Sequence, residues 1–326
     1  MDQGAIPIPG VRDTEIVAAW LYYHEGLTQA QVAKKLNVSR STVAGLLSQA
    51  KSQKVVSIAL APEYLSRLSL AEKLKKRFSL TDVLVSPIGT GSGYHSLTQA
   101  GALYLENSVE PGETLGVVWG RTILDVALAM NYRTIPDLTV VPTLGGLSSD
   151  DSFSSSRVAM LIADKLHASV NHIYVPVIVK SPEVQSILMG DPDISSAFDI
   201  ARNADRVILS VGRTGTDATV VRGGYITPPK MKQLEEKGAA GDLSGRFYDV
   251  DGRPIQDEVN DRILALTLEE LLAVPCLIAV AGGRRKAHAI LGALRGGYVD
   301  VLITDEDTAI ALLDSDDSSP GDTATR

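Results

Sequence analysis

The sequence has little cysteine and no long apolar run. Its single cysteine, Cys276, cannot form an internal disulfide, and the apolar stretch at 274–280 predicts a buried, small side chain there. No apolar run reaches about 18 residues, the length that a membrane-spanning helix needs. Residues 1–12 also lack the charged start and apolar stretch of a signal peptide. We therefore expect a cytoplasmic protein with no membrane partner.

Acidic residues are absent between Gly26 and Leu60, where five basic residues occur, although the 326-residue chain carries a net charge of −8. This end of the chain can face the phosphates of nucleic acid, which the remainder would repel. Hydrophobic residues make up 44% of the chain and charged residues 21%, which excludes a wholly disordered, collagen-like or coiled-coil protein. The length predicts two domains, or one large domain with a small appendage.

The first 60 residues have the spacing of a helix-turn-helix. A first helix is expected at about 13–24, with an inner face of Ile16, Trp20 and Tyr23. Thr28 and Gln31 form a capping-box pattern for a second helix of only about two turns. Asn37 can adopt the left-handed turn that follows it.

The third helix is the candidate recognition helix. Ser39 is expected to cap it, and its inner face is Val43, Leu46 and Leu47. A recognition helix reads base edges with its first turn, where Arg40 can donate two hydrogen bonds to a guanine. We expect the DNA-binding residues to be Gln29, Ser39, Arg40, Ser41 and Thr42, and a wing strand near 55–60. The alternative is a three-helix scaffold with a solvated basic face.

From residue 81 onward, short β-branched runs alternate with helical segments, which is typical of a parallel sheet covered by helices. Strands are expected near 83–86, 114–118, 138–141, 173–179, 206–211, 277–281 and 299–303. Helices are expected near 96–107, 122–131, 155–167, 195–203, 228–236, 286–294 and 305–313. The predicted organisation is a helix-turn-helix DNA-binding domain at 1–60, a connector helix at 61–80, an α/β effector-binding domain at 81–313 and a disordered acidic tail at 314–326.

Four glycine-rich turns follow expected strands, at 116–122, 144–146, 211–215 and 281–286. Ligands of such sheets bind outside the carboxyl ends of the strands, so these turns predict a pocket. Arg121, Thr122 and the free amides of a helix start can hold an anion or a sugar hydroxyl. Asp242 can accept hydrogen bonds from a polyol, with Lys286 as its positive counterpart. The alternatives are glycines that only cap or pack, and an Asp242 that only caps a turn.

These motifs resemble the SorC/DeoR-type sugar-binding transcriptional regulators, over about residues 16–313. The resemblance rests on VSRSTV at 38–43, WGRT at 119–122, GAAGD at 238–242 with GRF at 245–247, AGG at 281–283 with Lys286, and LITDE at 302–306. It implies a large Rossmann-like, mostly parallel α/β sugar-sensing domain related to sugar-phosphate isomerases and deaminases, and assembly as dimers or tetramers. The effector-binding positions that it implies are Gly120, Arg121, Thr122, Gly145, Gly146, Asp242 and Lys286.

Two positions depart from the pattern of this family. Gly45 stands where many relatives have a basic residue on the recognition helix, which leaves more of the base reading to Arg40. Lys54 stands where a glycine commonly precedes the wing. The operator sequence therefore does not follow from the family.

The expected function is a DNA-binding transcriptional regulator of a carbohydrate or polyol utilisation operon. Its expected partners are operator DNA, a sugar, sugar phosphate or polyol effector, and further copies of itself. The alternative is a phosphosugar-processing enzyme, which needs a carboxylate or histidine as general base, and no histidine falls within the four glycine-rich turns. A DNA-binding scaffold without a ligand is a third class, which the pocket-like turns oppose. No cofactor is expected, and no metal site, because no His, Cys and Asp cluster has ligand spacing.

Overall fold

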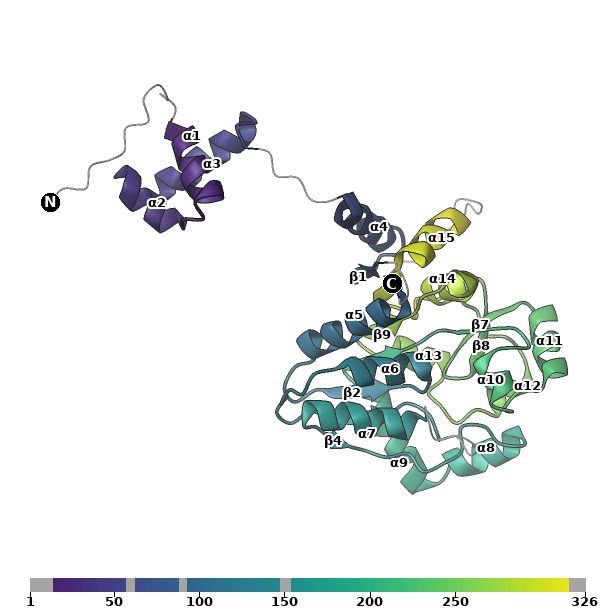
Figure 1. Cartoon of the computed structure of the whole chain (residues 1–326). Helices are drawn as coiled ribbons and strands as arrows, with labels where there is room; N and C mark the ends of the chain where they lie inside the picture. Colours follow the sequence, from purple (N-terminus) through teal and green to yellow (C-terminus); the bar gives the residue numbers. More distant parts are fainter. Residues whose placement is uncertain (1–13, 57–61, 88–92, 147–153, 317–326) are drawn as a thin grey trace. The chain divides into compact units, whose positions relative to one another are not determined.

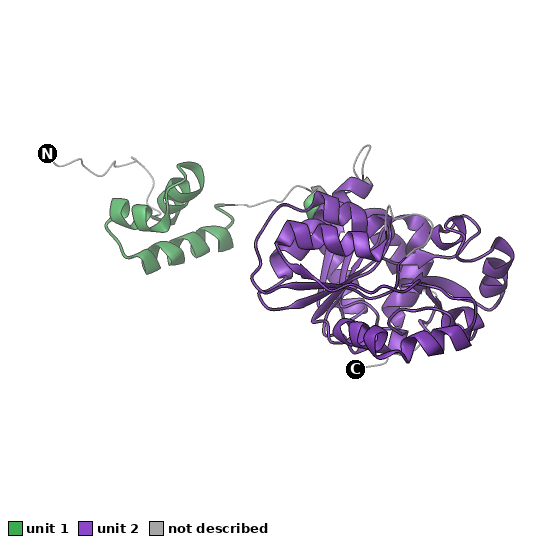
Figure 2. Ribbon diagram, turned by 90° about the horizontal axis from the view of Figure 1, so that it is seen from below, with its two compact units in different colours: residues 1–64 green, residues 65–326 purple. Residues whose placement is uncertain are grey.

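The computed structural model describes residues 14–56, 62–87, 93–146 and 154–316. The chain divides into two compact units, residues 1–64 and residues 65–326 (Figure 2). The division falls within helix α4 (Pro62–Arg77), in the segment for which the sequence predicts a connector helix. No helix in these four described ranges is long and apolar enough to cross a membrane.

Unit 1 is a small helical unit with the turn chemistry that its sequence predicts. Its elements are α1 (Thr14–Ala19), the π-helical turn η1 (Trp20–His24), α2 (Gln29–Leu36) and α3 (Arg40–Ser52). Thr28 and Gln31 form a complete capping box at the start of α2, and Asn37 ends that helix in the left-handed conformation with φ +56°. The Ser39 hydroxyl caps α3 by accepting a hydrogen bond from the Thr42 amide at 3.0 Å.

The inner face predicted for the first helix is wrong at two of its three residues, Trp20 and Tyr23, while Ile16 is half-buried. Trp20 and Tyr23 are 45% and 37% exposed, whereas Ala18, Ala19 and Leu21 are buried in the core of unit 1. Small alanines allow α1 to approach α3 closely, so the helix turns this side inward rather than its largest rings. The predicted wing is not supported at Val55 and Val56, which form no strand, and residues 57–60 lie outside the described residues.

Unit 2 is built on a seven-stranded parallel sheet in the order β1-β10-β9-β5-β2-β3-β4. The strands are β1 (Asp82–Ser86), β2 (Thr114–Val117), β3 (Thr139–Pro142), β4 (Ser169–Val170), β5 (Arg206–Leu209), β9 (Leu277–Val280) and β10 (Val301–Asp305). The central strands are buried on both sides, as helices cover the sheet (Figure 1). This is the mostly parallel α/β architecture that the sequence predicts.

Helices α5 (Gly93–Ser108), α6 (Arg121–Ala129) and α7 (Ser155–Leu166) pack in sequence beside one another. The remaining helices are α8 (Pro182–Met189), α9 (Pro192–Arg202), α10 (Thr219–Arg222), α11 (Pro228–Glu236), α12 (Glu258–Asp261), α13 (Leu268–Leu272), the 3₁₀ turn η3 (Arg284–Lys286), α14 (Ala287–Arg295) and α15 (Glu306–Asp316). Helix α15 continues into the tail predicted at 314–326, of which residues 317–326 lie outside the described ranges.

A second, antiparallel sheet in the order β6-β7-β8 is absent from the sequence prediction. Its strands are β6 (Gly212–Arg213), β7 (Ala239–Leu243) and β8 (Arg246–Asp249). The strand predicted at 173–179 is also wrong, since this segment forms only isolated bridges, at Pro176 and Ile178. Cys276 is half-buried rather than buried, because it precedes β9 beside the Arg206 guanidinium.

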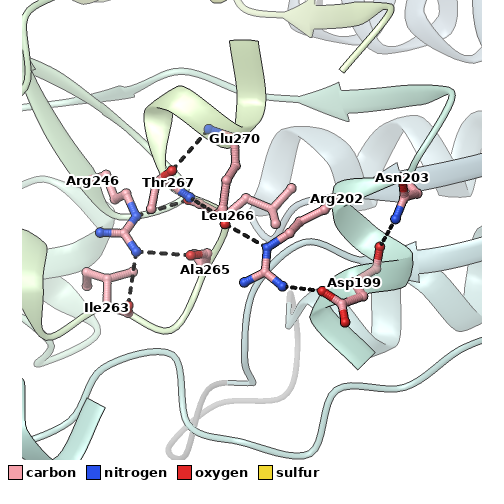
Figure 3. Close-up of polar contacts among 9 residues, drawn as sticks. All are labelled: Asp199, Arg202, Asn203, Arg246, Ile263, Ala265, Leu266, Thr267 and Glu270. Carbon is pink, nitrogen blue, oxygen red and sulfur yellow. Dashed lines mark hydrogen bonds and ion pairs between the residues drawn. The ribbon is translucent and has the colours of Figure 1, made fainter. Parts of the chain in front are cut away.

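Arg246, on β8, is buried and holds the chain segment at 260–266 against the rest of unit 2. Its guanidinium donates to the carbonyl oxygens of Leu266, Ala265 and Ile263 (Figure 3) and of Asn260. The same segment meets the turn after β3, where the Gly145 amide donates to the Leu264 carbonyl at 2.9 Å. One buried cation thus satisfies four backbone acceptors that would otherwise lie unpaired.

Candidate functional site

A cavity of about 300 Å³ lies at the carboxyl ends of the central strands β2 and β5. Five of the seven predicted effector residues line it: Gly120, Arg121, Thr122, Asp242 and Lys286. The turns after β2 and β5, the start of α10 and the β7–β8 turn meet there. The other lining residues are Tyr94, Trp119, Ser210, Val211, Gly212, Arg213, Asp217, Ala218, Thr219, Val220, Arg222 and Ser244.

The other two predicted effector residues, Gly145 and Gly146, do not line this cavity. A Cβ at Gly145 would lie 2.5 Å from the Val175 carbonyl oxygen, so the glycine permits close approach of two backbone segments. Gly146 lines a separate hollow of about 570 Å³ together with Val177 and Arg262. Gly145 therefore has a packing role, which the sequence of the turn does not distinguish from a binding role.

Asp242 places a carboxylate at the wall of the cavity. Its side chain is 5% exposed, and one oxygen accepts a hydrogen bond from the Gly245 amide at 3.1 Å. A Cβ at Gly212, opposite it on β6, would overlap the other oxygen, so a side chain at 212 would displace the Asp242 carboxylate from this position. Burial raises the pKa of Asp242 to about 6, against the opposing effect of the Lys286 charge.

Lys286 is the positive counterpart that the sequence predicts. Burial lowers the pKa of its ammonium group, while the charge of Asp242 acts to raise it. The two groups influence one another without direct contact: within the described part of the chain, the Lys286 ammonium forms no ion pair. Both charges are therefore available to a bound molecule that carries hydroxyl groups and a negative charge.

Arginines add further positive charge around the cavity. Arg121 is the first residue of α6, whose N-cap Gly120 has φ +118° and no side-chain cap, so the amides of the first turn are open. Arg213 pairs with Asp217 at 2.6 Å, and Arg285 pairs with the same carboxylate at 3.1 Å. These two partners lower the pKa of Asp217 and balance its charge, which leaves the cavity with an excess of cations.

Several lining residues escape the sequence prediction. Tyr94, on α5, donates to Asp125 at 2.9 Å, and burial raises its pKa to about 12. Ser244 is 4% exposed with φ +53°, and its hydroxyl has no partner among the described residues. Arg213 lies within the glycine-rich turn at 211–215 and Ser210 directly precedes it, and this turn is the one sequence signal for these two residues. Tyr94, Arg222 and Ser244 reach the cavity only through folding.

The predicted DNA-binding residues of unit 1 occupy two helix starts. Arg40, Ser41 and Thr42 are exposed in the first turn of α3. The Ser39 hydroxyl lies 2.7 and 2.8 Å from the hydroxyls of Ser41 and Thr42, so it is engaged as the cap of the helix. Gln29 and Arg40 line one hollow of unit 1, which brings these two candidates together.

Comparison with known proteins agrees with this architecture. Residues 63–314 match the family described as "Putative sugar-binding domain". The chain is 35% identical over 309 residues to the "Uncharacterized transcriptional regulator YjhU" of Escherichia coli (strain K12), covering 92% of this chain and 94% of that protein. It is 33% identical over 302 residues to the "Deoxyribonucleoside regulator" of Bacillus subtilis (strain 168), covering 91% and 96%.

Among solved structures, the chain is similar to the full-length sorbitol operon regulator SorC from Klebsiella pneumoniae. The TM-score is 0.72 at 26% sequence identity, covering 92% of this chain and 98% of that one. The similarity thus extends over both units and not only over the α/β sheet. The chain belongs to the SorC/DeoR family of sugar-binding transcriptional regulators.

Proposed function

We propose that this protein regulates a carbohydrate or polyol utilisation operon, and that a phosphorylated sugar or polyol in the cavity of unit 2 controls its affinity for operator DNA. The observation that carries the proposal is the composition of the cavity. It combines a carboxylate that can accept hydroxyl hydrogen bonds, Asp242, with three cations, Arg121, Arg222 and Lys286, that form no ion pair among the described residues.

The size and charge of the cavity favour one small anionic ligand. A volume of about 300 Å³ is at the lower limit for small-molecule sites, which suits a monosaccharide or short polyol. A phosphate group carries about −1.5 to −2 charges at neutral pH. Arg121 and the open amides of the α6 start form a suitable partner for it. Asp242 then accepts hydrogen bonds from hydroxyl groups of the same ligand.

Unit 1 is the proposed DNA-binding part, with residues 1–60 as its extent. Arg40 projects from the first turn of α3, which is the end that a recognition helix presents to base edges. One unit offers one such helix, so we infer a dimer or tetramer that binds paired half-sites. The names of the relatives, a sorbitol operon regulator and a deoxyribonucleoside regulator, support a sugar-type effector. From operator binding we infer a cytoplasmic location.

An operator sequence is first selected from random duplexes with the full-length protein. Fluorescence anisotropy then measures the affinity of the protein for this operator with and without sugar and polyol phosphates. Arg40→Ala is expected to lose about 1 to 3 kcal/mol of operator binding and to relax preference at one base pair. Asp242→Asn and Lys286→Met should lose the effector response while their ligand-free operator affinity stays within a few-fold of wild type. By linkage, DNA must change effector affinity by the same factor as effector changes DNA affinity. A retained response in both cavity variants contradicts the proposed site.

One observation favours a second function, a phosphosugar-processing enzyme. Asp242 has a pKa of about 6 next to a lysine of lowered pKa, which is the kind of pair that transfers protons. No histidine belongs to the described lining of the cavity, and the described residues contain no group of three His, Cys, Asp or Glu side chains placed to hold a metal. Incubation with phosphosugars, followed by NMR, decides between the two: turnover that Asp242→Asn abolishes supports an enzyme.

A further inference from the structure

Unit 1 contains a hollow of about 740 Å³ between the end of η1, the start of α2 and the start of α3. It is lined by Tyr22, Tyr23, Gly26, Leu27, Thr28, Gln29, Ala30 and Arg40. Gln29 and Arg40 are already candidate DNA contacts. Tyr22 and Tyr23 belong to the first helical segment and have no assigned role, so the hollow extends the candidate DNA face to a third element of the unit.

The π-helical turn places both tyrosines in this lining. The Glu25 amide donates to the Trp20 carbonyl, and the Leu27 amide donates to the Leu21 carbonyl, each at 3.1 Å, which widens the end of the helix. The two tyrosine rings meet edge to face at 4.9 Å, and Tyr22 also packs against the core of unit 1. The rings are thus held by packing, while neither hydroxyl has a hydrogen-bond partner among the described residues.

The charge around the hollow indicates what the hydroxyls bind. Arg40 lines the hollow, and the Lys51 ammonium lies 5.9 Å from the centre of the Tyr23 ring. Glu25, which is exposed, is the nearest carboxylate along the chain, and no acidic residue follows it before Leu60. The Thr28 hydroxyl is occupied, since it donates to the Gln31 side chain at 2.8 Å. The side-chain donors left in this lining are therefore the two tyrosine hydroxyls, the Gln29 amide and the Arg40 guanidinium, which together suit an anion with several acceptor oxygens.

We propose that Tyr22 and Tyr23 contact DNA, and that their hydroxyl groups donate hydrogen bonds to a backbone phosphate held between them, Gln29 and Arg40. This inference rests on the proposed function, in which unit 1 binds DNA. A contact to a phosphate fixes the position of the recognition helix but reads no base, so it acts equally on every sequence. That property makes it testable without the operator.

The test uses the full-length protein and a duplex of random sequence, about 30 base pairs long, in anisotropy titrations from about 50 to 200 mM salt. Tyr22→Phe and Tyr23→Phe each remove one hydroxyl and keep the ring, and each should weaken binding by about 3- to 10-fold. Because a hydroxyl releases no counterion, the dependence of affinity on salt should stay as in wild type. Arg40→Ala, in contrast, should reduce that slope by about one.

Tyr174→Phe is the matched control, because Tyr174 is an 87% exposed tyrosine of unit 2. It should bind the duplex as wild type does, and circular dichroism should show wild-type helix content for all variants. If wild type binds the random duplex and the double variant Tyr22→Phe/Tyr23→Phe binds it equally well, the phosphate contact is refuted and the DNA-binding function stands. If wild type itself fails to bind at low salt, the proposed function of unit 1 fails, and this inference fails with it.

Discussion

Replacing Asp242 by asparagine should stabilise the ligand-free protein, although it removes a residue of the proposed effector site. The carboxyl group of Asp242 is buried, and its native pKa is about 6, above the ordinary value of 3.8. The native state therefore binds this proton more tightly than the unfolded state does. Below about pH 4 the group is protonated in both states and has no effect. As pH rises from 4 through 6, the ionised group lowers the free energy of unfolding progressively.

The magnitude follows from the same difference in pKa. At 1.36 kcal/mol per pH unit, ionised Asp242 destabilises the native state by about 3 kcal/mol above pH 6. Asparagine is uncharged at every pH and keeps an oxygen that accepts from the Gly245 amide. We expect Asp242→Asn to unfold with a free energy up to about 3 kcal/mol larger than wild type at pH 7.5, and with an equal free energy near pH 4. The figure, which already includes the attraction of Asp242 for Lys286, is an upper limit, because the amide NH2 group of a buried asparagine also requires hydrogen-bond acceptors.

Urea denaturation between pH 4 and pH 8 measures this difference. The chain has two tryptophans, Trp20 in unit 1 and Trp119 beside the cavity. In a Trp20→Phe background, the fluorescence of Trp119 reports on unit 2 alone. A variant that is no more stable than its parent at pH 7.5, or a difference that does not depend on pH, would show that Asp242 is not held as a destabilised carboxylate.

Three further substitutions test interactions that stabilise unit 2 outside the cavity lining. Gly145→Ala should lower the stability of unit 2 by about 2 kcal/mol or more in thermal unfolding, because the new Cβ meets the backbone at Val175 and Pro176. Gly146→Ala is the matched control, because a Cβ at this position would lie no closer than 3.9 Å to any neighbouring atom. Arg246→Met should lower stability by about 3 to 5 kcal/mol in urea, because four carbonyl acceptors lose their donor, and a change below 1 kcal/mol would contradict this role. The pKa of Asp257 is lowered to about 2 by hydrogen bonds to two lysines, which stabilises the native state above pH 4, and this stabilisation is lost as pH falls through 2. Asp257→Asn should therefore be about 2 kcal/mol less stable than wild type at pH 7, and the difference should close as pH falls below about 2, as followed by circular dichroism.

Local signals carried most of the successful sequence predictions. The capping box at Thr28, the left-handed Asn37 and the Ser39 cap each depend on neighbours within four residues, so the sequence contains the whole interaction. The buried parallel strands are equally visible, since both their faces are apolar. The π-helical turn η1 is not visible in the sequence. A regular helical period continued through it assigns Trp20 and Tyr23 to the core, where the structure does not have them.

The cavity lining is only partly predictable from the sequence, because a glycine after a parallel strand can serve either of two purposes. Gly120 and Gly145 both follow parallel strands, yet the first opens a helix start to the cavity and the second permits backbone contact with Val175. Nothing in their neighbours separates the two uses. Arg222 and Tyr94 lie 128 positions apart in the numbering and meet at the cavity only when the sheet has formed. Lining residues that are this far apart in the sequence can be identified only from the tertiary structure.

The fit between Gly212 and Asp242 has a consequence for how this protein can change over generations. A side chain at Gly212 would occupy the space of the Asp242 carboxylate, so a mutation at either position alters what the other tolerates. A lineage that replaces Gly212 must displace or shorten the side chain at 242, and in doing so it gives up the carboxylate in its present position at the cavity. Descendants that respond to a different small molecule should therefore show paired replacements at these two positions, while a lineage that keeps Asp242 should retain glycine at 212.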